Sequence, residues 1–441
     1  MIGGRVRSAT LGMAVMAVAA GSAQAARLEY MFDLGVEQND NLSLSSTEPL
    51  DDTIYRPSVG FALSEDAERL RADFAGRVEY RHYADGTYDN GFVGELSGRG
   101  DWLAIPGRLT FTVEDSLAQE AIDSFEADSP DNRQQVNAFA IGPTVDFRMG
   151  DALDGQIELR YVDTDAEVTD EFNSSRIDLT LRSIRKIDET SQLAFNLRGQ
   201  NVDFDDEITG RNYRRGDFYA SYDKHLNRLD LQLDAGYSHI GYTDGLDSRS
   251  EPLLRADLTW IFDDSNRLAV QMARQFSDAA TDTMVRLEED AVVPGSILTG
   301  DTVINASPFI ERRASLDYSF TSALFTASLE LYAHELDYVE SDEFDQKGYG
   351  ARGTLLYVIN SRTMVGVFGA LDNTEYLQLG REEEIRLGRE EEIRRYGLNL
   401  SRSFSTHWSA RLEYLRYERD TSVLGDDANQ NSIFLVFRYT R

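Results

Sequence analysis

The chain of 441 residues contains no cysteine and only 8 prolines. The absence of cysteine excludes a disulfide scaffold, a thiol nucleophile and a zinc–thiolate site. The sequence also lacks any apolar run of about 18 residues, the length that a helix needs to cross a bilayer. A helical membrane protein is therefore excluded. A transmembrane barrel is not, because its individual strands give a much weaker apolar signal.

Positive charge is scarce. Lysine and arginine together number 44 against 77 acidic residues, which gives a formal net charge of −33. A sequence-independent nucleic-acid binder needs a basic face to displace counterions, so no nucleic-acid partner is expected. Apolar residues make up 41% of the chain, which argues against a disordered protein.

The N-terminus has the order of features found in a secretory signal peptide. Arg5 and Arg7 are followed by an apolar stretch at residues 11–20 (LGMAVMAVAA) and by small residues at 23–25 (AQA). This apolar stretch is too short to serve as a membrane anchor. The sequence therefore predicts a signal peptide at residues 1–25 and a mature domain at 26–441.

The mature chain repeats one pattern from end to end. At residues 28–36 every second residue is apolar, and the same alternation returns at 70–80, 229–237, 254–262 and 325–331. A period of two indicates a strand with one apolar face and one polar face. We count about twenty such runs, most of them roughly 8 to 11 residues long, which suits a tilted strand that crosses a bilayer.

The connections between these runs are of two kinds. Short links rich in turn-forming residues occur at 64–68, 105–108, 150–155, 263–266 and 360–362. The long, acidic connections cover about residues 37–53, 117–136, 162–175, 201–216, 277–308 and 372–395. Short periplasmic turns and long extracellular loops are typical of outer-membrane barrels. We therefore predict an all-β, antiparallel, up-and-down transmembrane β-barrel of about 20 strands (18–22) in the outer membrane of a Gram-negative bacterium.

If the apolar faces contact lipid, the alternate faces line a lumen. The candidate lumen-lining residues are Arg71, Asp73, Arg77, Glu79, Arg160, Asp178, Arg182, Arg198, Asp234, Arg255, Asp257, Arg313, Glu330, Arg352, Arg411 and Arg438. Both charge signs occur among them, which suits a water-filled channel for polar solutes. The same residues could instead pair across neighbouring strands and hold the wall in register. Both interpretations stay open at this stage.

No plug domain is expected, because the first predicted strand follows the signal peptide directly. A barrel of about this size without a plug predicts an open or loop-constricted pore. The long connections at 117–136 and 277–308 are candidates to fold inward as constrictions. We expect deletion of either connection to raise the single-channel conductance.

The sequence holds little catalytic chemistry. There is no H-E-x-x-H pair, no G-x-S-x-G elbow and no P-loop. Ser238 and His239, with Asp244 and Asp247 nearby, are the best candidates for catalysis, but neighbours along a strand point to opposite faces. We therefore expect neither an enzyme nor a cofactor or resident metal.

Two further motifs are a carboxylate-rich segment and a short repeat. Carboxylates alternate at 163–167, in what we take to be a loop, but Val168 and Ser174 occupy the sixth and twelfth positions, where an EF-hand needs glycine and glutamate. A divalent-cation bridge to lipopolysaccharide stays open there. The sequence LGREEEIR occurs at 379–386 and again at 387–394. The glutamate–arginine spacing would support a helix, but we interpret the repeat as a duplication within an exposed loop.

Three segments resemble a known family. Residues 35–42 (GVEQNDNL), 53–61 (TIYRPSVGF) and 78–83 (VEYRHY) resemble the first three strands of the β-barrel porin 2 family of outer-membrane proteins. The resemblance implies a barrel without catalytic residues that helps extracellular polysaccharide to cross the outer membrane, alongside periplasmic export components. Many outer-membrane barrels end on an aromatic residue. This chain differs, because Thr440 and Arg441 follow Tyr439.

Three functions compete at this stage. The first is a polysaccharide export barrel, in which aromatic rings such as Tyr219 would line the lumen. The alternative is a general or substrate-specific porin for small polar solutes. A structural or adhesive surface protein is the third. In each case outer-membrane lipids and lipopolysaccharide are the expected surroundings.

Overall fold

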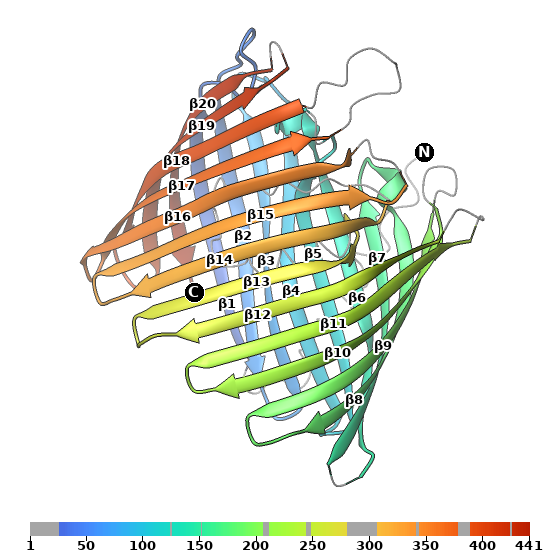
Figure 1. Ribbon diagram of the computed structural model, residues 1–441. Coiled ribbons are helices and arrows are strands. Elements are labelled where there is room, and N and C mark those ends of the chain that lie inside the picture. The colour runs from blue at the N-terminus through green and yellow to red at the C-terminus, as the bar shows by residue number, and fades with distance from the viewer. Residues whose placement is uncertain are drawn as a thin grey trace, which may run out of the picture.

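The computed structural model describes residues 26–123, 126–150, 152–205, 211–243, 248–279, 307–340, 344–377, 389–423 and 426–441. The predicted signal peptide at 1–25 lies outside these residues. Twenty antiparallel strands form one sheet, which curves into a barrel (Figure 1). Residues 130–132 and 170–172 form short 3-10 turns. In the described part of the chain, no helix is long and apolar enough to span a membrane.

The strands follow one another in chain order. They are β1 (Arg27–Asn39), β2 (Asp52–Asp66), β3 (Leu70–Tyr83), β4 (Gly91–Ile105), β5 (Leu109–Ala121), β6 (Arg133–Arg148), β7 (Leu153–Ala166), β8 (Ser174–Lys186), β9 (Ser191–Phe204), β10 (Tyr213–Leu226), β11 (Leu229–Tyr242), β12 (Arg249–Ile261), β13 (Asn266–Ser277), β14 (Phe309–Thr321), β15 (Phe325–Tyr338), β16 (Gln346–Asn360), β17 (Thr363–Tyr376), β18 (Arg389–Ser403), β19 (Trp408–Thr421) and β20 (Ala428–Thr440).

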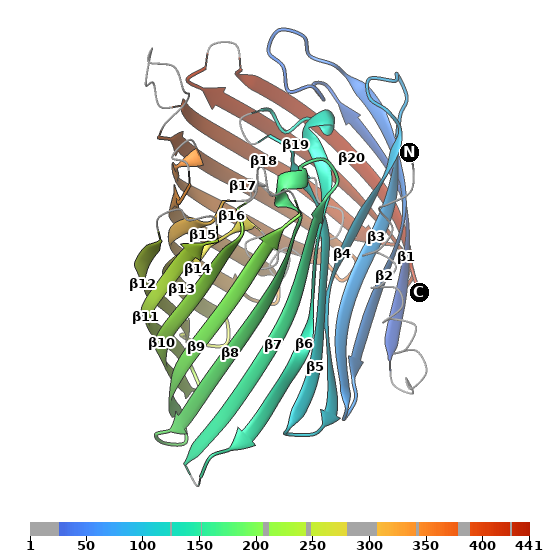
Figure 2. The same ribbon diagram turned by 90° about the vertical axis from the view of Figure 1, so that its right-hand side faces the viewer.

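The barrel is closed by its first and last strands. β1 pairs with β20, from Met31 opposite Thr440 to Asn39 opposite Ser432. In Figure 2 the blue strand β1 accordingly lies beside the red strand β20. Closure gives every strand two neighbours, so the backbone groups of both edges find partners, as a bilayer requires. The predicted fold class and strand number are confirmed.

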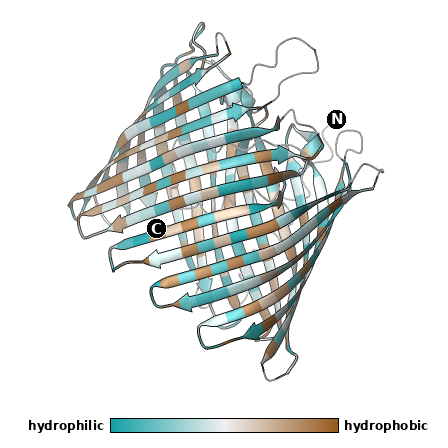
Figure 3. Ribbon diagram, in the orientation of Figure 1, coloured by the Kyte–Doolittle hydropathy of each residue, from teal (hydrophilic) through white to brown (hydrophobic). Residues whose placement is uncertain are grey.

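The two faces of the wall differ as the alternation predicts. Large apolar side chains are exposed on the outer face, among them Leu34 (68% exposed) and Phe92 (73%). The residues next to Leu34 and Val36 on the inner face, Asp33 and Glu37, are buried. Figure 3 shows hydrophobic and hydrophilic residues alternating along the strands. Such exposed apolar side chains are unfavourable in water and favourable in lipid.

The connections differ at the two ends of the barrel. At one end, which we call the turn end, links such as 227–228 and 361–362 are very short. At the other, the loop end, the links include 40–51, 122–132, 278–308 and 377–388. Barrels of the outer membrane place the turns in the periplasm and the loops outside the cell.

The strands are longer than predicted. They range from the 12 residues of β13 to the 16 residues of β6, because the backbone ladder continues above the apolar belt, where outward residues such as Arg214 and Glu392 are polar. The interpretation of the repeat is accordingly wrong for its second copy. From Arg389 onward this copy forms the start of β18, where Glu390 lies opposite Glu375 and Arg394 opposite Leu371. The first copy lies outside the described residues.

The wall is interrupted between β12 and β13 at the loop end. Their pairing stops with Leu254 opposite Arg274, although β13 continues to Ser277 and stays paired with β14. The ends of β13 and β14 therefore leave the ladder that joins them to β12.

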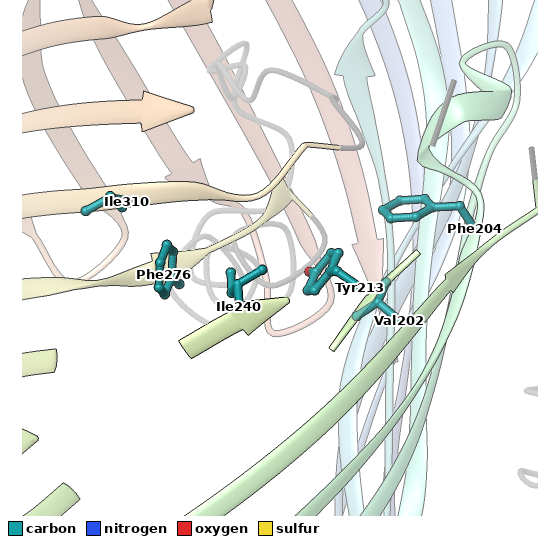
Figure 4. Packing of buried hydrophobic residues seen from close by; sticks show 6 residues of the cluster. All are labelled: Val202, Phe204, Tyr213, Ile240, Phe276 and Ile310. Atoms are coloured by element: carbon teal, nitrogen blue, oxygen red, sulfur yellow. The ribbon is translucent and has the colours of Figure 1, made fainter. Parts of the chain in front are cut away.

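These ends turn into the barrel. Phe276 of β13 and Ile310 of β14 form one buried cluster with Val202, Tyr213 and Ile240 (Figure 4). The last three residues lie on the inner face of β9, β10 and β11, because they alternate with outward side chains. The ends of β13 and β14 thus cover part of the inner wall. We call residues 276–279 and 309–310 the inward overlap.

Candidate solute channel

All sixteen candidate lumen residues lie on strands. Each alternates along its strand with outward side chains, so the backbone places it on the inner face. Their positions are Arg71, Asp73, Arg77 and Glu79 on β3, Arg160 on β7, Asp178 and Arg182 on β8, Arg198 on β9, Asp234 on β11, Arg255 and Asp257 on β12, Arg313 on β14, Glu330 on β15, Arg352 on β16, Arg411 on β19 and Arg438 on β20.

The inner wall contains a cavity of about 1020 Å³ along β1 to β9. Small side chains make room for it, and they are Ala62, Ala75, Ser97, Ser116 and Ala140. Charged side chains surround this floor, and they include Asp73, Arg99, Glu114, Glu158, Arg160, Arg176, Asp178 and Arg198. We call this cavity the wall recess. Four of the sixteen candidate residues line it, namely Asp73, Arg160, Asp178 and Arg198.

Sequence reasoning missed Arg99, Glu114 and Arg176. Arg99 lies between Gly98 and Gly100, and a glycine on the outer face hides the apolar alternation. The structure gives a reason for one of these glycines, because a Cβ atom on Gly98 would lie 2.2 Å from the ring of Phe74. Counting every second residue from Trp102 would have placed Arg99 on the inner face.

The arginines of the wall recess are paired with carboxylates. Arg198 of β9 donates to Asp178 of β8 at 2.6 Å, and Arg99 of β4 donates to Glu114 of β5 at 2.6 Å. Arg160 lies 3.4 Å from Glu158 on its own strand. The charges of the recess are therefore largely compensated within the wall.

Cross-strand pairing also occurs elsewhere on the inner face. Arg255 of β12 lies 2.7 Å from Asp234 of β11, and Arg438 of β20 lies 2.7 Å from Asp33 of β1. Pairing across strands, one of the two roles left open by the sequence, is thus present in the structure. A field along the lumen does not follow from these pairs alone, because matched charges largely cancel at a distance.

A buried network occupies the inner face of β1 to β3. Arg56 donates to Glu37 at 2.7 Å and to Glu79 at 2.9 Å, and all three side chains are buried. Arg77 and Arg81 also approach Glu79, at 3.7 and 3.0 Å. Such a network rigidifies this part of the wall, because each charge has a partner and no charge is buried alone.

The remaining candidates differ in their surroundings. Arg182 donates to Asn196 at 2.7 Å, Arg71 lies 3.6 Å from the exposed Asp66, and Arg411 pairs with Glu413. Arg352 lies 4.0 Å from Glu330 and 3.6 Å from Asp372. Within the described ranges no ion pair involves Arg313.

The inner-face tyrosines do not form an open track. The guanidinium of Arg255 lies 5.0 Å from the ring centre of Tyr219, and Arg352 lies 5.1 Å from that of Tyr332. Tyr219 is also buried. One face of each ring is thus already taken by a cation.

Several loops turn inward at the loop end. Leu44 of the 40–51 loop is buried with Tyr417 and Ala428, and Ala127 of the 122–132 loop packs against the same cluster. The described part of the predicted 117–136 constriction therefore does reach across the inner side of the barrel. Of the predicted 277–308 constriction, residues 280–306 lie outside the described residues.

The start of that connection is anchored on the inner face of β8 and β10. Asp278 accepts a hydrogen bond from Arg176 of β8 at 3.0 Å and one from the Tyr213 hydroxyl of β10 at 2.8 Å. Ala279 is buried with Val136 and Ala166, which lie on β6 and β7.

Of the catalytic candidates, the structure describes only Ser238 and His239. His239 is hydrogen-bonded to Ser250 at 2.9 Å and not to its neighbour Ser238, while Asp244 and Asp247 lie outside the described residues. No cluster of histidine and carboxylate side chains in the described ranges could hold a metal ion. The placement of residues 163–166 in a loop is wrong, because β7 extends to Ala166.

Comparisons with known proteins add the following. No family model and no curated relative matches the chain, so the resemblance to the β-barrel porin 2 family stays a prediction. Among solved structures, the chain is similar to the siderophore receptor PirA from Pseudomonas aeruginosa (10% identity, 94% of this chain and 80% of that chain, TM-score 0.42). It is also similar to OccK2 (OpdF) from the same organism (9%, 95% and 98%, 0.39) and to the FrpB iron transporter from Neisseria meningitidis (9%, 94% and 81%, 0.46).

The location follows from the barrel itself. The twenty strands close on each other, the outer face is apolar, and the long connections gather at one end. A closed sheet of this kind satisfies its backbone groups within lipid, whereas an open sheet does not. The chain is thus an outer-membrane β-barrel of a Gram-negative bacterium.

Proposed function

We propose that this barrel is a channel that lets small polar solutes cross the outer membrane. The observation that carries the proposal is the wall recess, a charged cavity of about 1020 Å³ on the inner face of a lipid-facing barrel. Cavities that bind small molecules typically measure about 300–1,000 Å³. The recess therefore has room for a small solute together with water.

The charge pattern of the recess suits passage. A conducted solute must be held strongly enough to enter and weakly enough to leave. Arg99, Arg160 and Arg198 can donate hydrogen bonds to a solute, and Glu114 and Asp178 can accept them. Because these groups already neutralise one another, neither charge sign would trap the solute. In this proposal the protein is a transporter and not an enzyme.

Export of a polysaccharide is the second candidate, favoured by the resemblance of residues 35–42, 53–61 and 78–83. A polymer path needs open aromatic faces and a wide mouth. The rings of Tyr219 and Tyr332 are covered by arginines, and the 40–51 and 122–132 loops turn inward. These observations favour small solutes. A gene-deletion strain that loses its extracellular polymer while its small-solute uptake stays unchanged would reverse this preference.

Conductance in planar bilayers tests the proposal. The purified mature protein should form open, ion-conducting channels, and a silent barrel would contradict it. We expect Arg198→Met to shift the reversal potential in a salt gradient toward cation selectivity, because Asp178 loses its partner. Asp178→Asn should shift it toward anion selectivity.

The double variant with Arg198→Met and Asp178→Asn should have a reversal potential close to that of the wild type, because it removes both members of the ion pair. Arg416→Met is the matched control, since Arg416 alternates with inner-face residues on β19 and pairs with Glu418 at 3.0 Å on the outer face. This control should leave the selectivity unchanged. Equal shifts in the reversal potential of Arg198→Met and Arg416→Met would show that the recess is not part of the conduction path.

A further inference from the structure

We propose that Asp278 is a positioning residue that holds the inward overlap inside the barrel and thereby sets the width of the lumen at the loop end. The proposal rests on the proposed channel function for its effect on the lumen. The contacts that hold the overlap inside the barrel do not depend on that function. The overlap is a departure from the closed wall, and departures of this kind need specific contacts to persist.

Asp278 is held by side chains from two nearby strands, β8 and β10. Arg176 of β8 reaches both of its carboxylate oxygens at 3.0 Å, and Tyr213 of β10 donates to it at 2.8 Å. All three side chains are at least nine-tenths buried. A buried carboxylate is stable only with such charged and hydrogen-bonding partners, so this site fixes the position of the chain that follows β13.

A second contact fixes the backbone two residues earlier. Arg215 of β10 donates to the carbonyl oxygen of Phe276 at 2.7 Å, and the same guanidinium is oriented by Asp217 at 2.9 Å. The side chain of Phe276 meanwhile lies in the apolar cluster with Ile240. Polar and apolar contacts therefore pull the same segment against the inner wall.

Two charge pairs also join β12 to the ends of β13 and β15 beside the overlap. Arg249 and Glu251 lie on the inner face of β12, because they alternate with the outward residues of that strand. Arg249 lies 3.2 Å from Asp337 of β15, and Glu251 lies 2.6 Å from Arg274 of β13. These contacts form only if the ends of β13 and β15 lie behind β12, on the lumen side.

A fully paired wall is not the alternative arrangement here, because Pro252 of β12 has no N–H to offer Phe276 where the pairing with β13 stops. Without Asp278, the overlap would instead lose the ion pair and the hydrogen bond that hold it against β8 and β10. The overlap would then withdraw from the lumen, and the lumen would widen.

Single-channel recording tests this inference. We expect Asp278→Asn to raise the conductance at least about twofold, since conduction is set by the narrowest charged or apolar constriction. Tyr213→Phe should raise it less, because it removes one hydrogen bond and leaves the pair with Arg176. Asp420→Asn is the matched control, because Asp420 pairs with Arg394 at 3.0 Å on the outer face of β18 and β19. A conducting wild type with an unchanged Asp278→Asn variant would overturn the proposal.

A cross-linking experiment gives a readout that does not need conduction. The chain has no cysteine, so the pair Ala166→Cys and Ala279→Cys would carry the only thiols. Both alanines belong to one buried cluster, and dioxygen with a copper catalyst should oxidise the two thiols to a disulfide in an otherwise unchanged chain. We expect the yield to fall severalfold when Asp278→Asn is added.

The linked Asp278→Asn protein should return to the wild-type conductance, because the link replaces the lost ion pair. An equal cross-linking yield with and without Asp278 would contradict the positioning role. If the wild type proved silent while the yield still depended on Asp278, the channel function would fail and the positioning role would stand.

Discussion

Arginine is the residue on which the inner wall depends. Its guanidinium is charged at every relevant pH and can serve two carboxylates at once. Arg56 does this between Glu37 and Glu79, deep in the wall. Breaking such a buried pair leaves a charge without a partner, which costs far more than losing an exposed pair.

Arg56→Met should therefore lower the free energy of unfolding by about 3–5 kcal/mol, because Glu37 and Glu79 stay buried without their partner. Arg71→Met is the control. Its pair with Asp66 is exposed and is worth at most about 1 kcal/mol. Urea unfolding of both variants in lipid vesicles checks the difference, and similar losses in the two would refute the argument.

Tyr88 provides a pH-dependent contact in the 84–90 loop. Burial, followed by the nearby Asp131 and Tyr83, raises the pKa of Tyr88 to about 12 from the ordinary 10.0. The partly buried site favours the neutral phenol, so its contribution to stability is complete below about pH 10 and is lost as the pH rises through about 12. The T-shaped contact of Tyr88 with Tyr83 should loosen over that interval.

The difference between the ultraviolet titration curves of the wild type and of Tyr88→Phe measures the pKa of Tyr88. The difference should titrate near pH 12. A difference that titrates near pH 10 would show that the Tyr88 hydroxyl faces open water.

The elements of this barrel were predictable where both faces carry a signal. At residues 28–36 the outward residues are apolar and the inward residues mostly polar, so alternation alone indicates the strand. Above the apolar belt both faces are polar. At 389–394 the sequence REEEIR therefore looks like a loop or helix, although its backbone forms ladder bonds with β17.

The inward overlap could not be read from the sequence for another reason. It depends on contacts between residues far apart in the chain, such as Arg176 with Asp278 and Arg249 with Asp337. Alternation tells which face a residue occupies, but it does not tell which other strand that face will meet. The pairing of individual charges in the wall recess was likewise left open, because it needs the register of neighbouring strands.

A charge placed on the outer face of β1 should be costly in a depth-dependent way. Leu34 lies near the middle of the strand and Leu28 near its turn end, and both are exposed on that face. We expect Leu34→Arg to destabilise the folded barrel by about 2–4 kcal/mol and Leu28→Arg by about 0–1 kcal/mol. Folding free energies in lipid vesicles check this, and equal values would argue against a membrane-spanning wall.

The whole molecule depends on one closure. Removing β20, residues 428–440, would expose the edges of β1 and β19, and an open edge has no partner in lipid. We expect this deletion to abolish the folded form, seen as the loss of the mobility difference between heated and unheated samples in detergent gels.

A short glycine–serine insertion between residues 361 and 362 is the control for this deletion. It lies in an exposed turn of the link between β16 and β17, and loops of this kind tolerate insertions. The insertion should keep the mobility difference. A heat-sensitive folded form of the β20 deletion would show that nineteen strands suffice.

Because β1 must meet β20, the earliest and latest parts of the domain to be synthesised are the two that join. A partly made chain can therefore not complete its ladder, however much of it has already been secreted. The ribosome must finish, and the polypeptide must reach its membrane in an assembly-competent state with its future lipid-facing side chains shielded from water. The geometry of a single seam thus keeps the barrel open until β20 is available to pair with β1.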